Sequence, residues 1–350
     1  YIFKSNGTFY MIVGARKNGR GATTLHQYSP STKTWSNDGR IFYQALSTDY
    51  GVFWEMPLII PMNDGKWLFV TTQLGGKNGV ETLYWVGTIN PDGTFNPYSH
   101  TPKEVELGNT SKEGFGLLAP SIVQKDGKNI AIGIVPDKLG GDDNKRLGWA
   151  HLYSLPREWS LDVNNNLVQK PYEGLKTMRN NVPTFSMVNQ NLSGVQSLEP
   201  VNGKTIEIEG VFTVSSDLNQ KFGFNVRKSG ENAIKIFYQP ANNKFTVDAR
   251  TVNRMSNDGW LYNGLYESLL QETIPVGETL KMQIFIDHSI IDIFINSKWA
   301  FSIRIFPTDM NSNGIEAFSE GATTFVNSVK AWKLTGDDFT EIEKNMSTDK

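Results

Sequence analysis

One hairpin-like pattern occurs three times in the first half of the chain. Each copy has a short apolar run, an Asn-Gly or Asp-Gly pair and a second apolar run. The copies cover residues 1–13, 57–70 and 120–132, with turn glycines at Gly7, Gly65 and Gly127. Asx-Gly between apolar runs is the strongest short-range hairpin signal, because both turn positions need positive φ. The pattern therefore predicts three β-hairpins at a spacing of about 60 residues.

Further strand candidates follow each hairpin at nearly the same offset, at residues 23–28, 83–89 and 147–153. Four strands in each repeat are typical of a β-propeller blade. Three unrelated hairpins in a sandwich are the alternative, which the equal offsets disfavour. A closed propeller usually has about four blades or more. Three are visible, so the sequence predicts a truncated propeller whose missing part precedes Tyr1.

The second half of the chain has a different pattern. The repeat stops after about residue 172, and strict alternation of apolar and polar residues follows, for example in 205–209 and 234–238. The clearest hairpin joins 281–287 to 290–295. Many short strands with one buried face predict a β-sandwich. We expect a partial propeller domain at 1–172, a linker at 173–191, a C-terminal β-sandwich at 192–336 and a polar tail at 337–350.

Composition excludes several classes of function. The net charge is −2 with no long run of one sign, which argues against nucleic-acid partners. No apolar stretch approaches the roughly 18 residues of a membrane span, so no membrane partner is predicted. Without cysteine there is no disulfide framework, thiol catalysis or Cys-ligated zinc. The four histidines are scattered, so we expect neither a metal site nor another cofactor.

Glu55 is the strongest candidate for catalysis. It precedes the predicted inner strand that begins at Pro57, and the starts of inner strands converge on the mouth of a propeller channel. A carboxyl beside a tryptophan and a proline in such a pocket suits a general acid. Alternatively, Glu55 satisfies backbone donors at a strand end. Trp54 could stack on a sugar ring or lie in the blade core, and Phe115 should line the same mouth.

Several stretches make the resemblance to a known family specific. Trp54-Glu55-Met56-Pro57 resembles the Glu-Cys-Pro motif of glycoside hydrolase family 32, the invertases, levanases and inulinases. Residues 1–15 resemble the blade that follows the family's Arg-Asp-Pro motif, and 148–158 resemble the end of its fourth blade. Residues 284–289 through 304–307 resemble the hallmark of its C-terminal sandwich. The likeness covers roughly residues 1 to 335.

This resemblance implies a five-bladed propeller with three acidic residues and a retaining mechanism at the fructosyl carbon. Glu55 matches the general acid/base. The motifs that hold the nucleophilic and the transition-state-stabilising aspartates do not occur in this chain, so we expect it to be inactive by itself. Met56 replaces the family's cysteine, a departure that alters the pocket wall and leaves the acid in place.

The expected function is hydrolysis of β-fructofuranosyl linkages in fructans or sucrose-type sugars. A fructosyltransferase using the same site and a non-catalytic carbohydrate-binding protein are the alternatives. The expected partner is a fructan or fructosyl oligosaccharide. Extracellular or periplasmic placement follows from the substrate class, because polymeric fructans do not readily cross a membrane.

Overall fold

The computed structural model describes residues 1–107, 116–137, 141–252 and 264–335. These residues are mostly β-strand and form two compact units. The first unit comprises Tyr1–Lys170 with Lys298–Ile303, and the second comprises Pro171–Ser297 with the residues from Arg304 onward. In the described part of the chain, every helix is too short or too polar to cross a lipid bilayer. The all-β class predicted from the sequence is confirmed.

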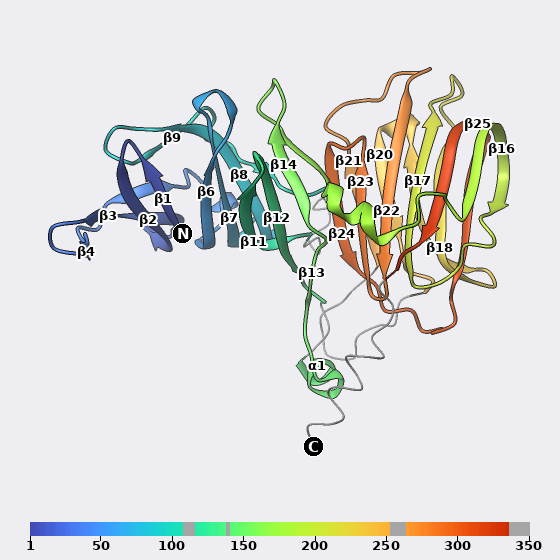
Figure 1. The fold of residues 1–350 in the computed structure, drawn as a ribbon, viewed down its shortest axis with the longest axis horizontal. Coiled ribbons are helices and arrows are strands. Elements are labelled where there is room, and N and C mark those ends of the chain that lie inside the picture. The colour runs from blue at the N-terminus through green and yellow to red at the C-terminus, as the bar shows by residue number, and fades with distance from the viewer. Residues whose placement is uncertain (108–115, 138–140, 253–263, 336–350) are drawn as a thin grey trace. The chain divides into compact units, whose positions relative to one another are not determined.

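The first unit contains three antiparallel sheets, drawn mainly in blue, cyan and green in Figure 1. The first sheet consists of β1 (Ile2–Ser5), β2 (Thr8–Lys17), β3 (Arg20–Ser29), β4 (Thr34–Trp35) and β5 (Ile41–Gln44). The second consists of β6 (Phe53–Pro61), β7 (Trp67–Gly76), β8 (Gly79–Ile89), β9 (Phe95–Pro97) and β10 (Lys103–Glu104). The third consists of β11 (Leu118–Lys125), β12 (Lys128–Val135), β13 (Leu152–Tyr153), β14 (Arg157–Leu161) and β15 (Leu167–Pro171). These sheets are the three predicted blades.

The Asx-Gly hairpins form where they are expected. Asn6 and Gly7 have φ of 48° and 80° and join β1 to β2, and Asp126 and Gly127 join β11 to β12 with φ of 52° and 72°. The turn of the second blade is wider. There Pro61 pairs with Trp67, and the 3-10 helix η2 (Asn63–Gly65) fills the turn.

Apolar side chains pack adjacent blades against each other. Phe42 of the first blade lies 5.4 Å from Phe69 of the second, measured between ring centroids. Tyr43 likewise lies 5.7 Å from Trp85. Large buried aromatic rings of this kind contribute much of the burial that stabilises a core.

The third blade departs from the sequence prediction at 147–153. Residues Gly141–Leu147 form helix α1, and only Leu152–Tyr153 of the expected outer strand pair with β12 as β13. The main partner of β12 on that side is β14, through Asn129 opposite Trp159. The outer strand was predicted from residue spacing alone. In the structure, the later segment β14 pairs with β12 instead.

The second unit is a strongly curled sheet. Its strands are β16 (Phe185–Ser197), β17 (Thr205–Thr213), β18 (Lys221–Ser229), β19 (Asn232–Gln239), β20 (Lys244–Asp248), β21 (Leu265–Leu269), β22 (Thr279–Asp287), β23 (Ile290–Ile295) and β25 (Gly314–Lys333). The order is β21-β20-β19-β18-β25-β17-β22-β23, and β16 also pairs with β25. β24 (Trp299–Arg304) groups largely with the first unit.

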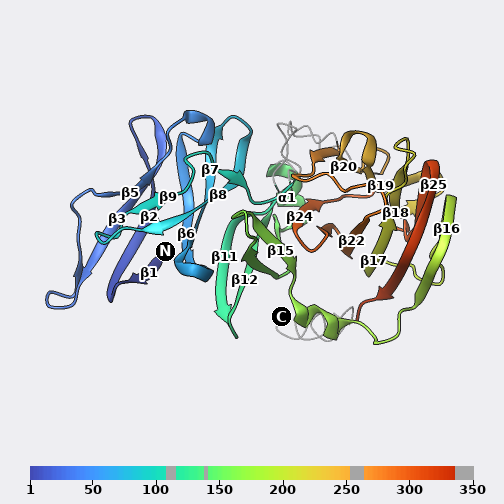
Figure 2. The same cartoon turned by 90° about the horizontal axis from the view of Figure 1, so that it is seen from above.

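The long strand β25 connects the two layers of this unit. Its C-terminal part, 325–333, pairs with β17, whereas its N-terminal part, 314–320, pairs with β18. Figure 2 shows β25 beside β16, which accompanies it along both parts. One strand therefore serves both layers of the predicted sandwich. The predicted hairpin is also present, because Asp287 pairs with Ile290 across a two-residue turn.

The remaining elements are short 3-10 helices, η1 (Thr48–Tyr50), η3 (Glu173–Met178) and η4 (Pro240–Asn242). Within the segment expected to be a linker, 173–191, the structure has η3 and the first part of β16. The polar tail expected at 337–350 lies outside the described residues.

Candidate active site

Glu55 lies on a β-bulge of the inner strand β6. The strand begins at Phe53, two residues before Glu55, whereas the sequence suggested a start at Pro57. Glu55 pairs with Thr72, and the register then shifts before Leu58. Met56 adopts a φ of 46° inside the bulge, a conformation that is costly for a non-glycine residue. Bulges re-aim side chains, and the side chain of Glu55 is exposed.

The backbone at Glu55 lies directly against the first blade. A Cβ atom added to Gly14 of β2 would be 2.2 Å from the carbonyl oxygen of Trp54 and 3.3 Å from the Cα of Glu55. Only glycine permits this approach. Within its own blade, the Thr71 hydroxyl donates to the carbonyl oxygen of Glu55 at 2.9 Å. These contacts fix the backbone and leave the carboxyl exposed.

Hydrogen bonds connect the start of the third inner strand, β11, to the part of the second blade that contains Glu55. Thr72, the cross-strand partner of Glu55, accepts a hydrogen bond from the backbone N–H of Ala119 at 2.8 Å. Its hydroxyl lies 3.1 Å from that of Thr82, which donates to the carbonyl oxygen of Leu117 at 2.7 Å. This threonine pair holds the beginning of β11 near Glu55. Nothing in the sequence pattern distinguished these threonines from ordinary strand residues.

Trp54 is a core residue and not the sugar-stacking platform considered from the sequence. Its side chain is completely buried, and its indole N–H donates to the carbonyl oxygen of Tyr50 at 2.7 Å. Its ring centroid lies 5.1 Å from that of Trp85 and 5.8 Å from that of Phe69. The other predicted wall residue, Phe115, lies outside the described residues.

A second carboxyl cluster lies in the same blade and was not predicted. Glu81 of β8 is buried and accepts hydrogen bonds from Gln73 and Asn78. Asn78 also donates to Glu104 of β10 at 3.4 Å. Burial, followed by repulsion from Glu81, raises the pKa of Glu104 to about 7.

A buried ion pair also contacts the backbone at the start of β11. Glu106 and Arg157 are both almost fully buried and form a charge-assisted hydrogen bond. Glu106 also accepts from the backbone N–H of Leu117 at 2.8 Å and from the backbone N–H of Ser302 at 3.1 Å. A buried carboxylate with this many donors positions the backbone segments that bind it.

The chemistry open to this arrangement is acid–base catalysis by Glu55. An exposed carboxyl can reach the leaving-group oxygen of a bound sugar and transfer a proton to it. Among the described residues, no group of three or more His, Asp or Glu side chains is arranged to hold a metal ion. A carboxylic acid that protonates the leaving-group oxygen is the group that most glycoside hydrolases use.

The chain belongs to glycosyl hydrolase family 32. The model of the family's N-terminal domain matches residues 1–171, and the model of its C-terminal region matches residues 174–333. The resemblance recognised from the sequence is therefore confirmed.

Two relatives and one solved structure illustrate the likeness. The chain is 26% identical over 342 residues to a sucrose-6-phosphate hydrolase from Staphylococcus xylosus, covering 96% of this chain and 65% of the relative. It is 27% identical over 299 residues to a levanase from Bacillus sp. strain L7, covering 81% of this chain and 31% of the relative. The chain thus spans less than two thirds of either protein.

The fold matches a crystal structure of fructan 1-exohydrolase IIa from Cichorium intybus in complex with 1-kestose. The TM-score is 0.77 at 18% sequence identity, over 95% of this chain and 70% of that one. At this identity the match establishes the fold, which includes the propeller-like sheets and the curled C-terminal sheet.

Proposed function

We propose that this protein is part of a glycosidase that cleaves β-fructofuranosyl linkages by a retaining mechanism. Family membership supports the reaction class. The observation that carries the role of Glu55 is its exposed carboxyl on the β6 bulge, close to the start of β11. In this mechanism Glu55 protonates the leaving-group oxygen and later removes a proton from the incoming water.

The same proposal predicts that the 350-residue chain is inactive alone. Retention requires a second carboxyl about 5 Å from the acid, and that carboxyl attacks the fructosyl carbon. In the family resemblance, the nucleophile belongs to an Asn-Asp-Pro motif that this sequence does not contain. Glu55 would then be half of a catalytic pair.

Fructose release from sucrose, inulin and levan tests the proposal. We expect none from the 350-residue chain and measurable release from the longest product of its gene. In that longer protein, Glu55→Gln should abolish release because the amide cannot donate the proton that the leaving group needs. Release by the 350-residue chain would contradict the two-carboxyl requirement, and full activity of E55Q would contradict the role of Glu55.

We also propose that the protein works outside the cytoplasmic membrane, in the medium or the periplasm. The support is the size of polymeric fructans, which do not readily pass a bilayer. Immunoblotting of culture medium, periplasm and cytoplasm would locate the protein. Its confinement to the cytoplasm would contradict this placement.

A further inference from the structure

A cavity of about 410 Å³ lies at the end of the blades opposite to Glu55. Pro61, the last residue of β6, is part of its wall, whereas Glu55 is near the start of the same strand. Six residues of strand separate the two, which corresponds to roughly 20 Å. One monosaccharide cannot touch both places, so the cavity is distinct from the candidate active site.

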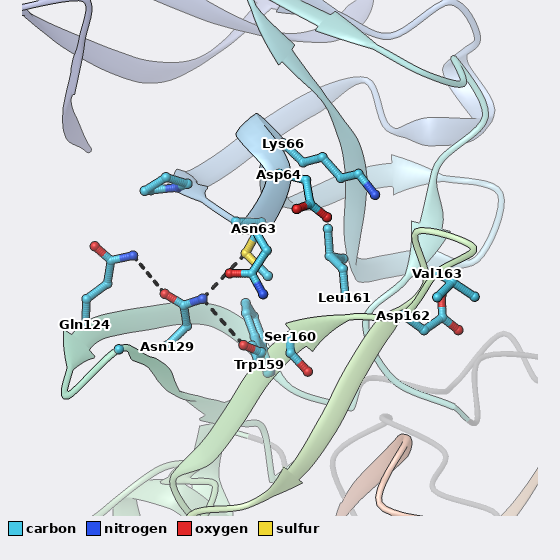
Figure 3. Close-up of a pocket in the computed structure, with 13 residues that line it drawn as sticks. Asn63, Asp64, Lys66, Gln124, Asn129, Trp159, Ser160, Leu161, Asp162 and Val163 are labelled. Atoms are coloured by element: carbon cyan, nitrogen blue, oxygen red, sulfur yellow. Dashed lines mark hydrogen bonds between the residues drawn. The ribbon is translucent and has the colours of Figure 1, made fainter.

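The wall of the cavity carries hydrogen-bonding side chains from three separate turns. Asn63 and Asp64 come from η2, Gln124 and Asn129 flank the β11–β12 turn, and Asp162 follows β14. Figure 3 shows these side chains around the opening. Cavities of several hundred cubic ångströms with a few converging polar groups are typical of small-molecule sites.

Asn129 is the best-placed donor of the group. Its Oδ1 accepts a hydrogen bond from Gln124 at 2.9 Å, which orients the amide. Its Nδ2 lies 3.5 Å from both the Met62 sulfur and the Trp159 carbonyl oxygen. The sulfur contact is of ordinary length, whereas the oxygen contact is at the outer limit of a hydrogen bond, so one of the two N–H groups retains donor capacity for a ligand. Figure 3 shows Asn129 between Gln124 and Trp159.

The charges at the wall balance, which favours a neutral ligand. Asp64, Asp162 and Lys66 line the cavity, and the Asp162 carboxylate is paired with the Lys298 ammonium group at 3.1 Å. Burial alone would raise the pKa of Asp162, but hydrogen bonds from Asn166 and Lys298 outweigh it and hold that pKa below its usual range. Asp162 therefore stays charged. A neutral molecule with many hydroxyl groups fits such a wall of amides, carboxylates and one ammonium group.

We propose that this cavity is a second saccharide-binding site that takes one or two units of a neutral oligosaccharide through the Asn129 amide. The choice of a fructosyl sugar as the ligand rests on the proposed function. The existence of the cavity does not depend on that proposal. A site roughly 20 Å from Glu55 would hold one part of a polymer while the acid works on another.

The test is calorimetric titration of the 350-residue chain with 1-kestose, with maltotriose as the control sugar. Asn129→Asp keeps the shape of the side chain and the acceptor for Gln124, and it removes both N–H donors. Asn96→Asp makes the same change at an exposed position of β9 and is the matched control. Loss of the donated hydrogen bonds should weaken binding about tenfold in N129D. N96D should bind as the unaltered chain does.

Thermal unfolding followed by circular dichroism shows that each variant is folded. Absence of 1-kestose binding to the unaltered chain, or equal binding by N129D, would overturn the second site. Fructose release by the longer gene product judges the proposed function separately, because that assay depends on Glu55 and not on Asn129.

Discussion

Glu104→Gln should change how the stability of the first unit depends on pH. The pKa of Glu104 rises from 4.5 to about 7 because of burial and the nearby carboxylate of Glu81. The folded state therefore binds this proton more tightly than the unfolded state does. Between about pH 4.5 and 7 the unfolded chain releases the proton first, so the free energy of unfolding falls as pH rises.

A pKa change of this size corresponds to about 3 kcal/mol at full effect. Glu104 is only partly buried, and solvent screening reduces the expected loss to about 2 kcal/mol. Glutamine has no proton to release, so E104Q should lose less stability than the unaltered chain between pH 5 and pH 8. At pH 8 the variant should be the more stable protein, because it removes one charge of a repelling pair.

Urea unfolding followed by tryptophan fluorescence at pH 5 and pH 8 measures this difference. Glu278→Gln, at an exposed position of the second unit, is the matched control and should leave the pH dependence unchanged. Carbon-13 NMR titration of the Glu104 carboxyl gives the pKa directly. A midpoint below pH 5, or parallel pH profiles for E104Q and the unaltered chain, would refute the reasoning.

Three further substitutions test the packing around Glu55. Gly14→Ala should destabilise the first unit by about 2 kcal/mol or more, because its methyl group would lie 2.2 Å from the backbone oxygen of Trp54. Urea unfolding measures the loss, and Gly141→Ala, whose methyl group would enter open space, is the control. Glu106→Gln should cost about 3 to 5 kcal/mol, because it removes the carboxylate charge that offsets the buried Arg157 charge, and an unchanged urea midpoint would contradict this. Glu55→Gln should change the melting temperature by less than about 2 °C, since its side chain is exposed, and a large loss would indicate a structural role.

Local turn chemistry made part of the fold predictable. Asn6-Gly7 and Asp126-Gly127 form tight hairpins because both positions adopt positive φ, which the residue types favour. The prediction of an outer strand at 147–153 was wrong, because α1 extends to Leu147 and β14 pairs with β12 instead. Which segment pairs with an existing strand depends on long-range contacts that residue spacing does not determine.

The candidate site was predictable only in part for the same reason. Glu55 could be selected from its neighbours in the sequence, but the burial of Trp54 depends on distant rings such as Tyr43 and Trp85. The threonine pair of β7 and β8 and the raised pKa of Glu104 arise from cross-strand neighbours. None of these pairings leaves a periodic signal in the sequence.

The inner strands β6 and β11 both contain a bulge. Comparing the two bulges shows whether this backbone conformation requires a carboxylate. In β11 the register shifts between Leu118 and Ser121, and Ala119 has a φ of 46°. The second blade shows the same shift after Glu55 and the same φ at Met56. Leucine occupies the position of Glu55 in the third blade, so this backbone forms without a carboxyl. An exposed glutamate there adds nothing that the bulge requires, which favours a chemical role for Glu55 over a structural one.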